Sequence, residues 1–484
     1  MGKIINAILE RFKTKPKPAT SAHAQYLKAF FDAAKTNANN RRRWNIADYQ
    51  ANYSNPYNDT EARRTILNRA RQTAGNNPYC KGMVLTMAND VISDVPRLQM
   101  LSDDDERNTR VEEAWRKWGE ETKLARKLRS MRYSQTVDGE AFAIIARNPN
   151  ANRLIKLDLQ VIDPAIVTSP MNAESDGFNI DGIDYDIYGN PTKYHVLKLE
   201  KNGYGTESRA INAADMIHVF RVDQAGQMRG ISEIAAALEI FSILGSYILS
   251  VLDAAQTAAA LTGIAKSQST ADDGAPMDDF YEWELERNQV MFLPAGWDFA
   301  QLKAEQPTTT FSEFVATVVN IAARAILIPY NVAAGNSSKF NFASGRLDFQ
   351  AYHRMISIIR DEYEVDILDR LFNSWYDSYL IETGDSGTGV LDYSWRWKGF
   401  AQIDPKKSAD ADAVNLANGT TTLAELCGRE GQDYNDVITQ RIKERKKVYD
   451  LESQYGLPHE TNSRATTQPA ETEDEESEVE KEAD

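Results

Sequence analysis

The chain has 484 residues, 42% of them hydrophobic and 26% charged, which is ordinary for a soluble globular protein with two or three domains. Its formal net charge of −16 argues against a protein that wraps nucleic acid by neutralising phosphates. The charge is unevenly spread, because residues 460–484 contain ten Asp and Glu residues against Arg464 and Lys481. This C-terminal tail therefore carries −8, half of the total.

The two cysteines, Cys80 and Cys427, are too few for a disulfide framework or a cysteine-rich zinc site. The histidines are scattered and lack the spacing of metal ligands: His23, His195, His218, His353 and His459. In residues 1–17 an apolar patch precedes the lysines, which is the reverse of a signal peptide. We therefore expect no metal, no cofactor and no secretion, with a reducing cytoplasm as the compartment.

Residues 1–45 are expected to form a mobile arm that ends at Arg41–Arg43. Helical periodicity then predicts helices over Thr60–Arg71, Asn77–Ser93 and Thr109–Met131. The acidic run Asp103–Glu106 precedes the third helix, and we interpret it as charge at a helix N-terminus rather than as a metal site.

The pattern then changes to strands. Ile155–Val161 alternates apolar and polar residues, and Met216–Val222 is a further strand. Ile183–Tyr188 and Lys193–Leu199 are predicted to pair as a hairpin about the turn Gly189–Pro191. Residues from about 50 to 225 thus form one α+β unit by this pattern.

No arrangement of residues predicts catalysis. Asp138-Gly139-Glu140 offers two carboxylates, but without a supporting His, Lys or second acidic motif we favour a turn that enters a strand. His218 lies in an apolar strand, which favours a hydrogen-bonded core histidine over a ligand. Gly226–Gly230 lacks the preceding glycine and the Lys-Ser/Thr end of a phosphate loop. We expect a protein that is not an enzyme and that leaves any ATP-driven motor to another chain.

Three long helical patterns follow: Ser232–Leu261, Phe311–Ile328 after a capping box at Thr310–Glu313, and a third from about Ser344. Small residues in the first pattern favour packing against copies of the same chain. Its segment Ile234–Leu252 carries only Glu239 as a charge and is close to the length that spans a bilayer. Because a charge at that depth costs about 2.5–3.5 kcal/mol, we favour a helix buried between subunits over a membrane span.

Two segments between these helices are candidates for interaction. An acidic, aromatic segment with a strand-like stretch lies between the first two helices. A polar loop, Gly335–Asn341, leads from Pro329 into the third helix. Loops of this composition between rigid helices are often functional, although an ordinary surface loop fits equally well.

The C-terminal part is predicted to be helical over Ala409–Leu451, with a break at Asn418–Gly419 and a capping box at Thr422–Glu425. From Gly456 onward the content of Thr, Gln, Pro and Glu predicts disorder.

Over most of residues 45–455 the chain resembles the lambda-type family of tailed-phage portal proteins. Each motif is weak alone, and the resemblance lies in their order and spacing: Asn76–Tyr79, Val137–Phe142, Ile217–Phe220, Gly226–Gly230, Ile321–Ala334, Ser344–Gln350, Gly431–Tyr434 and Gln440–Arg445.

The resemblance implies an α+β, mainly helical portal fold with wing, stem, clip and crown regions, assembled as a dodecameric ring at one capsid vertex. By position, residues 1–45 would be the arm, residues 46–230 the wing and residues 231–262 the first stem helix. The clip would follow at residues 263–308, the second stem helix at 309–329 and the tunnel loop at 330–343. Residues 344–399 would be the long helix and wing return, residues 400–457 the crown and residues 458–484 a disordered acidic tail.

The resemblance also implies that double-stranded DNA passes through the ring during packaging and ejection. The implied partners are the terminase large subunit, the major capsid and scaffold proteins, and a head-completion or tail adaptor protein. The protein would belong to the virion, at the portal vertex, after assembly in the host cytoplasm. A membrane-embedded oligomeric pore is the alternative, and a nuclease is a third interpretation that no carboxylate or histidine set supports.

The resemblance also supplies candidate site residues. The DNA-channel loop would comprise Asn336, Ser337, Ser338, Lys339, Phe340 and Asn341, with Asn336, Lys339 and Asn341 as transient phosphate contacts. The clip would dock terminase and then the adaptor, and its candidate residues are Asp272, Asp273, Asp278, Asp279, Tyr281 and Trp283.

Overall fold

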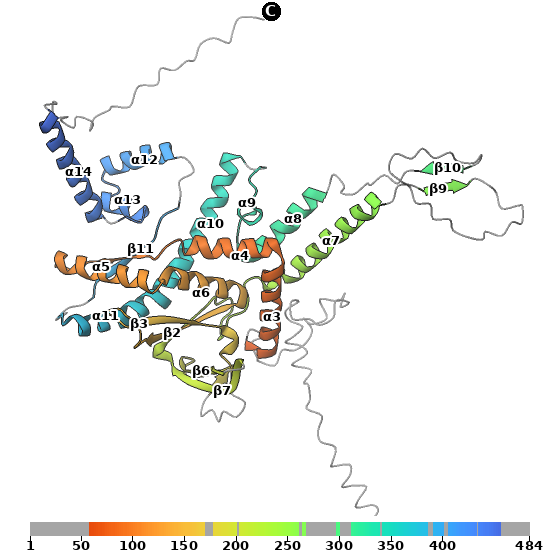
Figure 1. Cartoon of the computed structure of the whole chain (residues 1–484), viewed down its shortest axis with the longest axis horizontal. Helices are drawn as coiled ribbons and strands as arrows, with labels where there is room; N and C mark the ends of the chain where they lie inside the picture. The colour runs from red at the N-terminus through yellow and green to blue at the C-terminus, as the bar shows by residue number, and fades with distance from the viewer. Residues whose placement is uncertain are drawn as a thin grey trace, which may run out of the picture. The chain divides into compact units, whose positions relative to one another are not determined.

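The computed structural model describes residues 58–169, 178–200, 203–260, 264–267, 297–300, 311–338, 341–385, 391–400, 405–432 and 434–455. The chain divides into two compact units, Met1–Trp395 and Arg396–Asp484 (Figure 1). In the first unit helices combine with antiparallel sheets, and in the second unit the described elements beyond strand β11 are helical.

The described part of the first unit begins with α3 (Thr60–Asn76), α4 (Pro78–Val91), α5 (Asp105–Glu121) and α6 (Leu124–Asp138). The side chain of Asn77 accepts a hydrogen bond from the Cys80 N–H, and Pro78 occupies the first helical position, so both residues favour a helix start there. Asp104 caps α5 in the same way, which confirms that the acidic run marks a helix N-terminus.

The single helix predicted over Thr109–Met131 is wrong, because the chain turns between α5 and α6. Lys123 adopts φ 56° and ψ 44°, in the left-handed region. Thr122 ends α5 by donating its N–H and its hydroxyl to the Trp118 carbonyl, at 2.9 and 2.8 Å. Trp118 and Leu124 are both buried, yet in a straight helix residues six positions apart lie about 240° apart around the axis. The turn therefore lets both side chains reach the core.

Two antiparallel sheets pack beside these helices. The three-stranded sheet has the order β3–β2–β8, with β2 (Glu140–Arg147), β3 (Leu157–Ile162) and β8 (Met216–Phe220). The four-stranded sheet runs in sequence order through β4 (Phe178–Ile180), β5 (Ile183–Tyr185), β6 (Pro191–Glu200) and β7 (Gly203–Asn212). Pairing of Ile183 with Tyr194 confirms the predicted hairpin. One apolar cluster, which includes Phe142, Ile183 and Met216, joins the two sheets.

An aromatic core fixes α5 to the later part of the unit. Trp115 packs edge-on against Phe372 and Trp375, with ring centroids 5.4 and 5.2 Å apart. Trp395 lies 5.6 Å from Trp115, on strand β11 (Tyr393–Arg396), which pairs with β1 (Arg97–Met100). Aromatic pairs of this geometry contribute about 0.5–1.5 kcal/mol beyond the area they bury.

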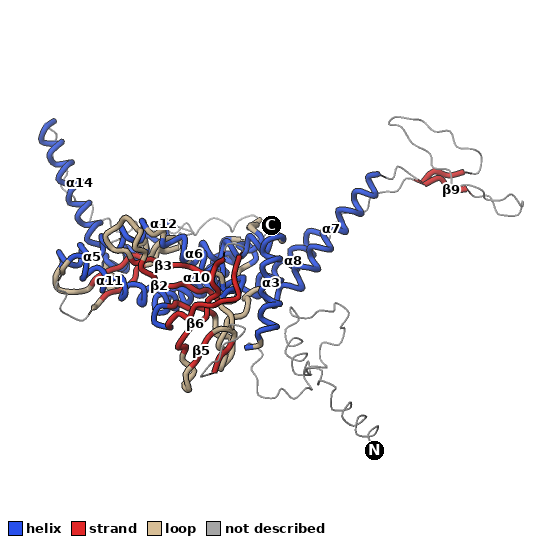
Figure 2. Tube along the Cα trace, turned by 60° about the horizontal axis from the view of Figure 1, so that its bottom comes forward, coloured by secondary structure: helices blue, strands red, loops and turns tan. Residues whose placement is uncertain are grey.

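Two helices, α7 (Leu238–Ala260) and α8 (Phe311–Ala323), run side by side (Figure 2). The Tyr247 ring contacts Phe311 and Phe314, at centroid distances of 5.8 and 5.0 Å. The second helix was predicted to reach Ile328, but its α-helical part ends at Ala323 and a 3-10 turn, Arg324–Ile326, follows. Leu327 then adopts φ 59°, which cannot continue a helix.

Between α7 and α8 in the sequence, β9 (Ile264–Ser267) pairs antiparallel with β10 (Trp297–Ala300), as expected of a strand-containing excursion. After α8 come α9 (Tyr330–Ala334), α10 (Phe342–Tyr363), a π-helical turn at Glu364–Leu368 and α11 (Asp369–Thr383). The Tyr352 hydroxyl donates to Asp90 at 2.8 Å, and Arg360 donates to the Val91 carbonyl at 3.0 Å. These bonds hold α10 against the end of α4.

The second unit contains α12 (Pro405–Ala417), α13 (Leu423–Arg429) and α14 (Tyr434–Tyr455). The predicted break after α12 is confirmed, since Gly419 adopts φ 67°. The predicted capping box is also confirmed: Thr422 caps the Glu425 N–H, and the Glu425 side chain accepts from the Thr422 N–H.

Lys123→Gly is expected to raise or preserve the free energy of unfolding, because a left-handed non-glycine residue costs about 1–2 kcal/mol that glycine avoids. The matched control is Lys117→Gly, an exposed position inside α5, where glycine should cost about 1 kcal/mol. Urea unfolding followed by circular dichroism measures both. Equal destabilisation by the two changes would show that α5 and α6 are continuous in solution.

Candidate functional site

Within residues 330–343, predicted as the tunnel loop, α9 occupies Tyr330–Ala334 and α10 begins at Phe342. Asn336 and Asn341 both make local bonds. The Asn336 side chain accepts from the Ser338 N–H at 3.0 Å, and the Asn341 side chain caps α10 by accepting from the Ser344 N–H at 2.8 Å. Gly335, Ser337 and their described neighbours in the loop are exposed. Two asparagines thus fix the ends of the loop.

The other predicted site residues fall outside the described residues. They are Lys339 and Phe340 in the loop, and Asp272, Asp273, Asp278, Asp279, Tyr281 and Trp283 in the clip.

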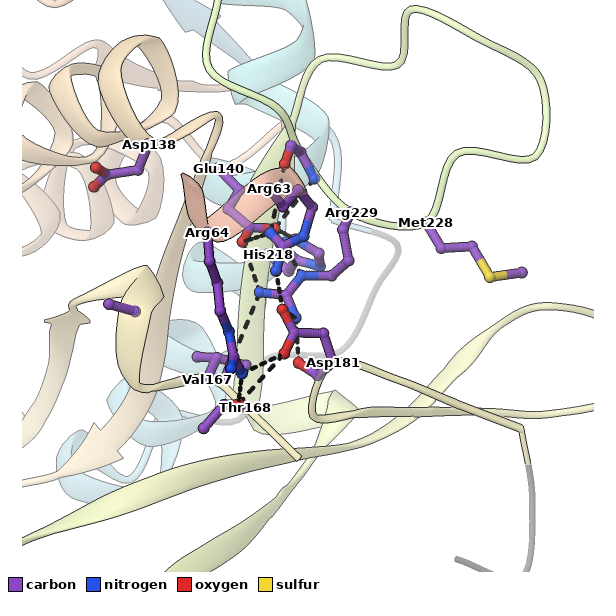
Figure 3. Close-up of polar contacts among 12 residues, drawn as sticks. Arg63, Arg64, Asp138, Glu140, Val167, Thr168, Asp181, His218, Met228 and Arg229 are labelled. Atoms are coloured by element: carbon purple, nitrogen blue, oxygen red, sulfur yellow. Dashed lines mark hydrogen bonds and ion pairs between the residues drawn. The ribbon is translucent and has the colours of Figure 1, made fainter. Parts of the chain in front are cut away.

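A buried polar cluster, centred on Glu140, lies at the start of β2 (Figure 3). Glu140 is fully buried. Arg229 holds it with two bonds, Nη2–Oε1 at 2.6 Å and Nε–Oε2 at 2.9 Å, and Arg63 adds Nη1–Oε1 at 2.7 Å. Burial by itself raises the pKa of Glu140, but the charges of Arg229 and Arg63 outweigh it and hold that pKa well below its usual value. The carboxylate is therefore ionised and paired inside the protein.

Three further groups complete this Glu140 cluster. Asp181 forms ion pairs with Arg63 and with Arg64, the latter at 2.9 Å, so a second carboxylate balances the arginines. The His218 ring nitrogen Nε2 lies 3.2 Å from Glu140 Oε2, and burial lowers the pKa of His218. This confirms the prediction of a hydrogen-bonded core histidine.

Two glycines bring the cluster together. Gly139 adopts φ +93°, and a Cβ on Gly230 would lie 2.1 Å from the Gly139 carbonyl oxygen. The two backbones therefore touch where neither side could carry a side chain. The Gly230 N–H also donates to Glu140 Oε2 at 3.1 Å. The close approach brings Arg229 within bonding distance of Glu140, the first residue of β2.

Asp138 points away from Glu140 (Figure 3), and it is bound by Arg71 at 2.7 and 3.0 Å. Burial raises the pKa of Asp138 even so. The two carboxylates thus have separate partners, and the prediction of a turn that enters a strand is confirmed. The role of Glu140 was missed. The available signal was that Val137–Phe142 and Gly226–Gly230 both carry the family resemblance.

A second buried pair fixes the segment that leads into α7. Arg132 of α6 makes two bonds to Glu233, both at 2.8 Å, and each side chain is about 3% exposed or less. The Glu233 N–H and the Ser232 hydroxyl both donate to the Thr136 carbonyl, at 3.1 and 3.3 Å. Further along, the Asn77 amide donates to the Phe241 carbonyl at 3.3 Å. The base of α7 is therefore tied to α4 and α6.

Beyond this base α7 and α8 expose large apolar side chains. The exposed fractions are 61% for Ile243, 63% for Leu249, 53% for Leu252, 50% for Phe314 and 54% for Ile321. By length and composition the helical segment Ala235–Gln256 could cross a membrane, and 22% of its apolar 18-residue window is buried. These side chains leave apolar surface on α7 and α8 that burial against a partner would stabilise.

Within the described residues, no group of three or more His, Cys, Asp or Glu side chains is placed to hold a metal ion. The Glu140 cluster consists of carboxylates neutralised by arginines that cannot lose their protons. Such an arrangement, with His218 bonded to Glu140, can position chain segments.

Glu140→Gln is expected to lower the free energy of unfolding by about 3–5 kcal/mol, because it leaves two buried arginines short of a countercharge. The control is Glu120→Gln, which removes an exposed pair with Arg116 that is worth at most about 0.5 kcal/mol. Chemical denaturation compares the free energies of unfolding of the two variants. Similar small losses of stability would show that the Glu140 cluster contributes little.

The stabilisation by Glu140 should depend on pH. The folded pKa lies below the ordinary 4.5, so the unfolded chain binds the proton more readily and the stabilisation is lost as pH falls. The stability difference between wild type and Glu140→Gln should stay constant from about pH 8 to 5.5 and shrink below about pH 4.5. A difference that grows on acidification would contradict the ion pairs.

Comparisons with known proteins identify the family. The sequence matches the lambda family of phage portal proteins over residues 38–360. It is 24% identical over 477 residues to the probable portal protein of Halomonas phage phiHAP-1, covering 87% of each chain. A chain in the virion of a native gene transfer agent particle matches with a TM-score of 0.43 and 15% identity, over 76% of this chain and 93% of that one.

An HK97 family phage portal protein from Corynebacterium diphtheriae matches with a TM-score of 0.28 and 12% identity, over 57% of this chain and 83% of that chain. The family match covers more than half of the sequence and includes α3 to α8, the Glu140 cluster and the loop before α10. The chain belongs to the lambda family of phage portal proteins.

Proposed function

We propose that the chain assembles into a dodecameric ring at one capsid vertex and that α7 and α8 form the stem around the DNA channel. Two features of α7 together support this. A buried ion pair holds the segment that leads into α7 against α6, and further along the helix Ile243, Leu249 and Leu252 are exposed. Neighbouring copies would cover that apolar surface.

The dimensions fit a DNA duplex. Twelve helices side by side at about 10 Å spacing make a circle roughly 38 Å across between axes. Subtracting one helix diameter leaves about 28 Å of clear width. A B-form duplex, whose major and minor grooves are about 8.5 and 7.5 Å deep, is narrower than this opening.

One face of α7 suits a channel lining. Glu239, Ser242, Ser246, Ser250 and Asp253 follow each other at steps of three or four, and all five are exposed. The serine hydroxyls donate to their own helix, Ser246 to the Ser242 carbonyl at 3.1 Å and Ser250 to the Ser246 carbonyl at 2.9 Å. The sequence of α7 contains no Lys or Arg. This face would repel phosphates and let DNA slide, whereas many cations would retain it.

The remaining regions keep their expected roles within the proposal. The loop that ends at Asn341 would meet DNA, with Lys339 as its cationic contact. The clip, residues 263–308, would dock terminase and then the adaptor protein, and capsid or scaffold proteins would surround the wing. The pairing of β9 with β10 supports a folded excursion at that place in the chain.

A membrane-embedded pore is the competing function, because Ala235–Gln256 has the length and hydropathy of a span. Two observations favour packing between subunits. Glu239 and Asp253 lie on the exposed side of the helix, and three serines share that side with them. In lipid these groups would be costly, but in a ring they would face the aqueous channel.

The test of assembly is negative-stain electron microscopy with native mass measurement on the purified chain in detergent-free buffer. The proposal predicts rings with a central hole and about twelve subunits. A monomer at high concentration would contradict self-assembly, and aggregation that only detergent relieves would favour the membrane pore.

Lys339→Ala is expected to leave ring assembly intact and to reduce DNA packaging or retention, because the loop loses its one cation. The control is Lys117→Ala, an exposed lysine of α5 far along the chain. DNA content per particle after in vivo assembly measures the effect. Packaging equal to that of the control would remove Lys339 from the DNA contacts.

A further inference from the structure

Helix α14 presents a dense group of positive charges. Five cations occur within one seven-residue stretch: Arg441, Lys443, Arg445, Lys446 and Lys447. All five are exposed, and no residue of the 22-residue helix is buried. This group is called the α14 basic cluster below. It stands out in a chain whose formal charge is −16.

The cluster is not neutralised by its surroundings. Glu444 is the only acidic residue inside the stretch, and the Gln440 amide donates to its Oε1 at 2.7 Å. Within the described part of the chain, none of the five cations forms a hydrogen bond or an ion pair. Lys443, Lys446 and Lys447 are spaced by three and four residues and so share one face of the helix.

The chain itself carries the complementary charge immediately after α14. Residues 460–484 hold ten carboxylates against Arg464 and Lys481. Nine of the ten are concentrated at the end: Glu471, Glu473, Asp474, Glu475, Glu476, Glu478, Glu480, Glu482 and Asp484. We propose that this acidic segment, residues 471–484, lies along the basic cluster of α14 and competes there with nucleic acid.

The length of the connection permits this contact. The cluster lies 8 to 14 residues before Tyr455, which at 1.5 Å per residue is about 12–21 Å from the helix end. A flexible segment of about 20 residues has a root-mean-square span of roughly 25 Å. The acidic segment therefore reaches the cluster readily, and the short tether gives it an effective concentration in the millimolar range.

The contact between the acidic segment and the α14 basic cluster would be reversible, because it consists of exposed ion pairs. Exposed ion pairs are individually weak, and salt at about 0.15 M screens charges beyond about 8 Å. Duplex DNA carries one negative charge per about 1.7 Å and is therefore a stronger competitor at high local concentration. The acidic segment would therefore occupy the basic cluster when DNA is scarce and be displaced where DNA is concentrated.

The first test uses three chains: the full chain, a chain that stops after Tyr455, and the shortened chain with Lys443→Gln, Lys446→Gln and Lys447→Gln. Binding of a short fluorescent DNA duplex is measured by anisotropy at two salt concentrations. The shortened chain should bind roughly tenfold more tightly than the full chain at low salt, with a steeper loss as salt rises. The three lysine changes should abolish the gain.

Equal affinity of the full and shortened chains would overturn the competition. A gain in affinity that survives the lysine changes would place the DNA-binding site outside the α14 basic cluster.

A second measurement tests the contact without DNA. Carbodiimide cross-linking of the full chain should join Lys443, Lys446 or Lys447 to residues 471–484, and about 1 M salt should suppress it. Cross-links no more frequent than those to the exposed Lys117 would contradict the proposal.

Discussion

The fold of the first unit depends on one buried carboxylate. Glu140 is completely enclosed, and a charge in that position is tolerated only if its partners arrive together. Those partners come from distant parts of the sequence, Arg63 on α3 and Arg229 ahead of α7. Satisfying Glu140 therefore requires that the helical layer, the three-stranded sheet and the base of α7 occupy their final places at once. The contact of Gly139 with Gly230 leaves no room for a different approach.

This constraint connects the fold to the proposed channel. The segment between Arg229 and Glu233 is held at both ends by buried ion pairs, so α7 leaves the body in a fixed direction. Its exposed apolar side chains then have one geometry to offer to neighbouring copies. The proposed ring would need identical subunit angles to close, and a loosely attached α7 would not provide them. The buried ion pairs at the base of α7 would therefore orient the apolar side chains that its outer part exposes.

Local patterns predicted the elements whose stability is local. The start of α4 at Asn77-Pro78, the β5–β6 hairpin and the capping box at Thr422 all follow from short-range chemistry. The errors arose where tertiary packing decides. The turn at Lys123 has no glycine or proline to announce it, and the Glu140 cluster pairs residues more than 70 positions apart. For the Glu140 cluster, the order of the family motifs was the one signal in the sequence. The contacts expected of the loop and the clip stay predictions.

Hydrogen exchange measured by mass spectrometry on wild type and Glu140→Gln would show whether Glu140 anchors the base of α7. The amides of Gly230, Glu233, Ala235 and Ala237 are hydrogen-bonded at the base of α7. Under native conditions Glu140→Gln should speed their exchange at least about tenfold, while the aromatic core around Trp115 keeps its protection. Unchanged protection at residues 230–237, or an equal loss across the whole unit, would show that Glu140 does not anchor the base of α7.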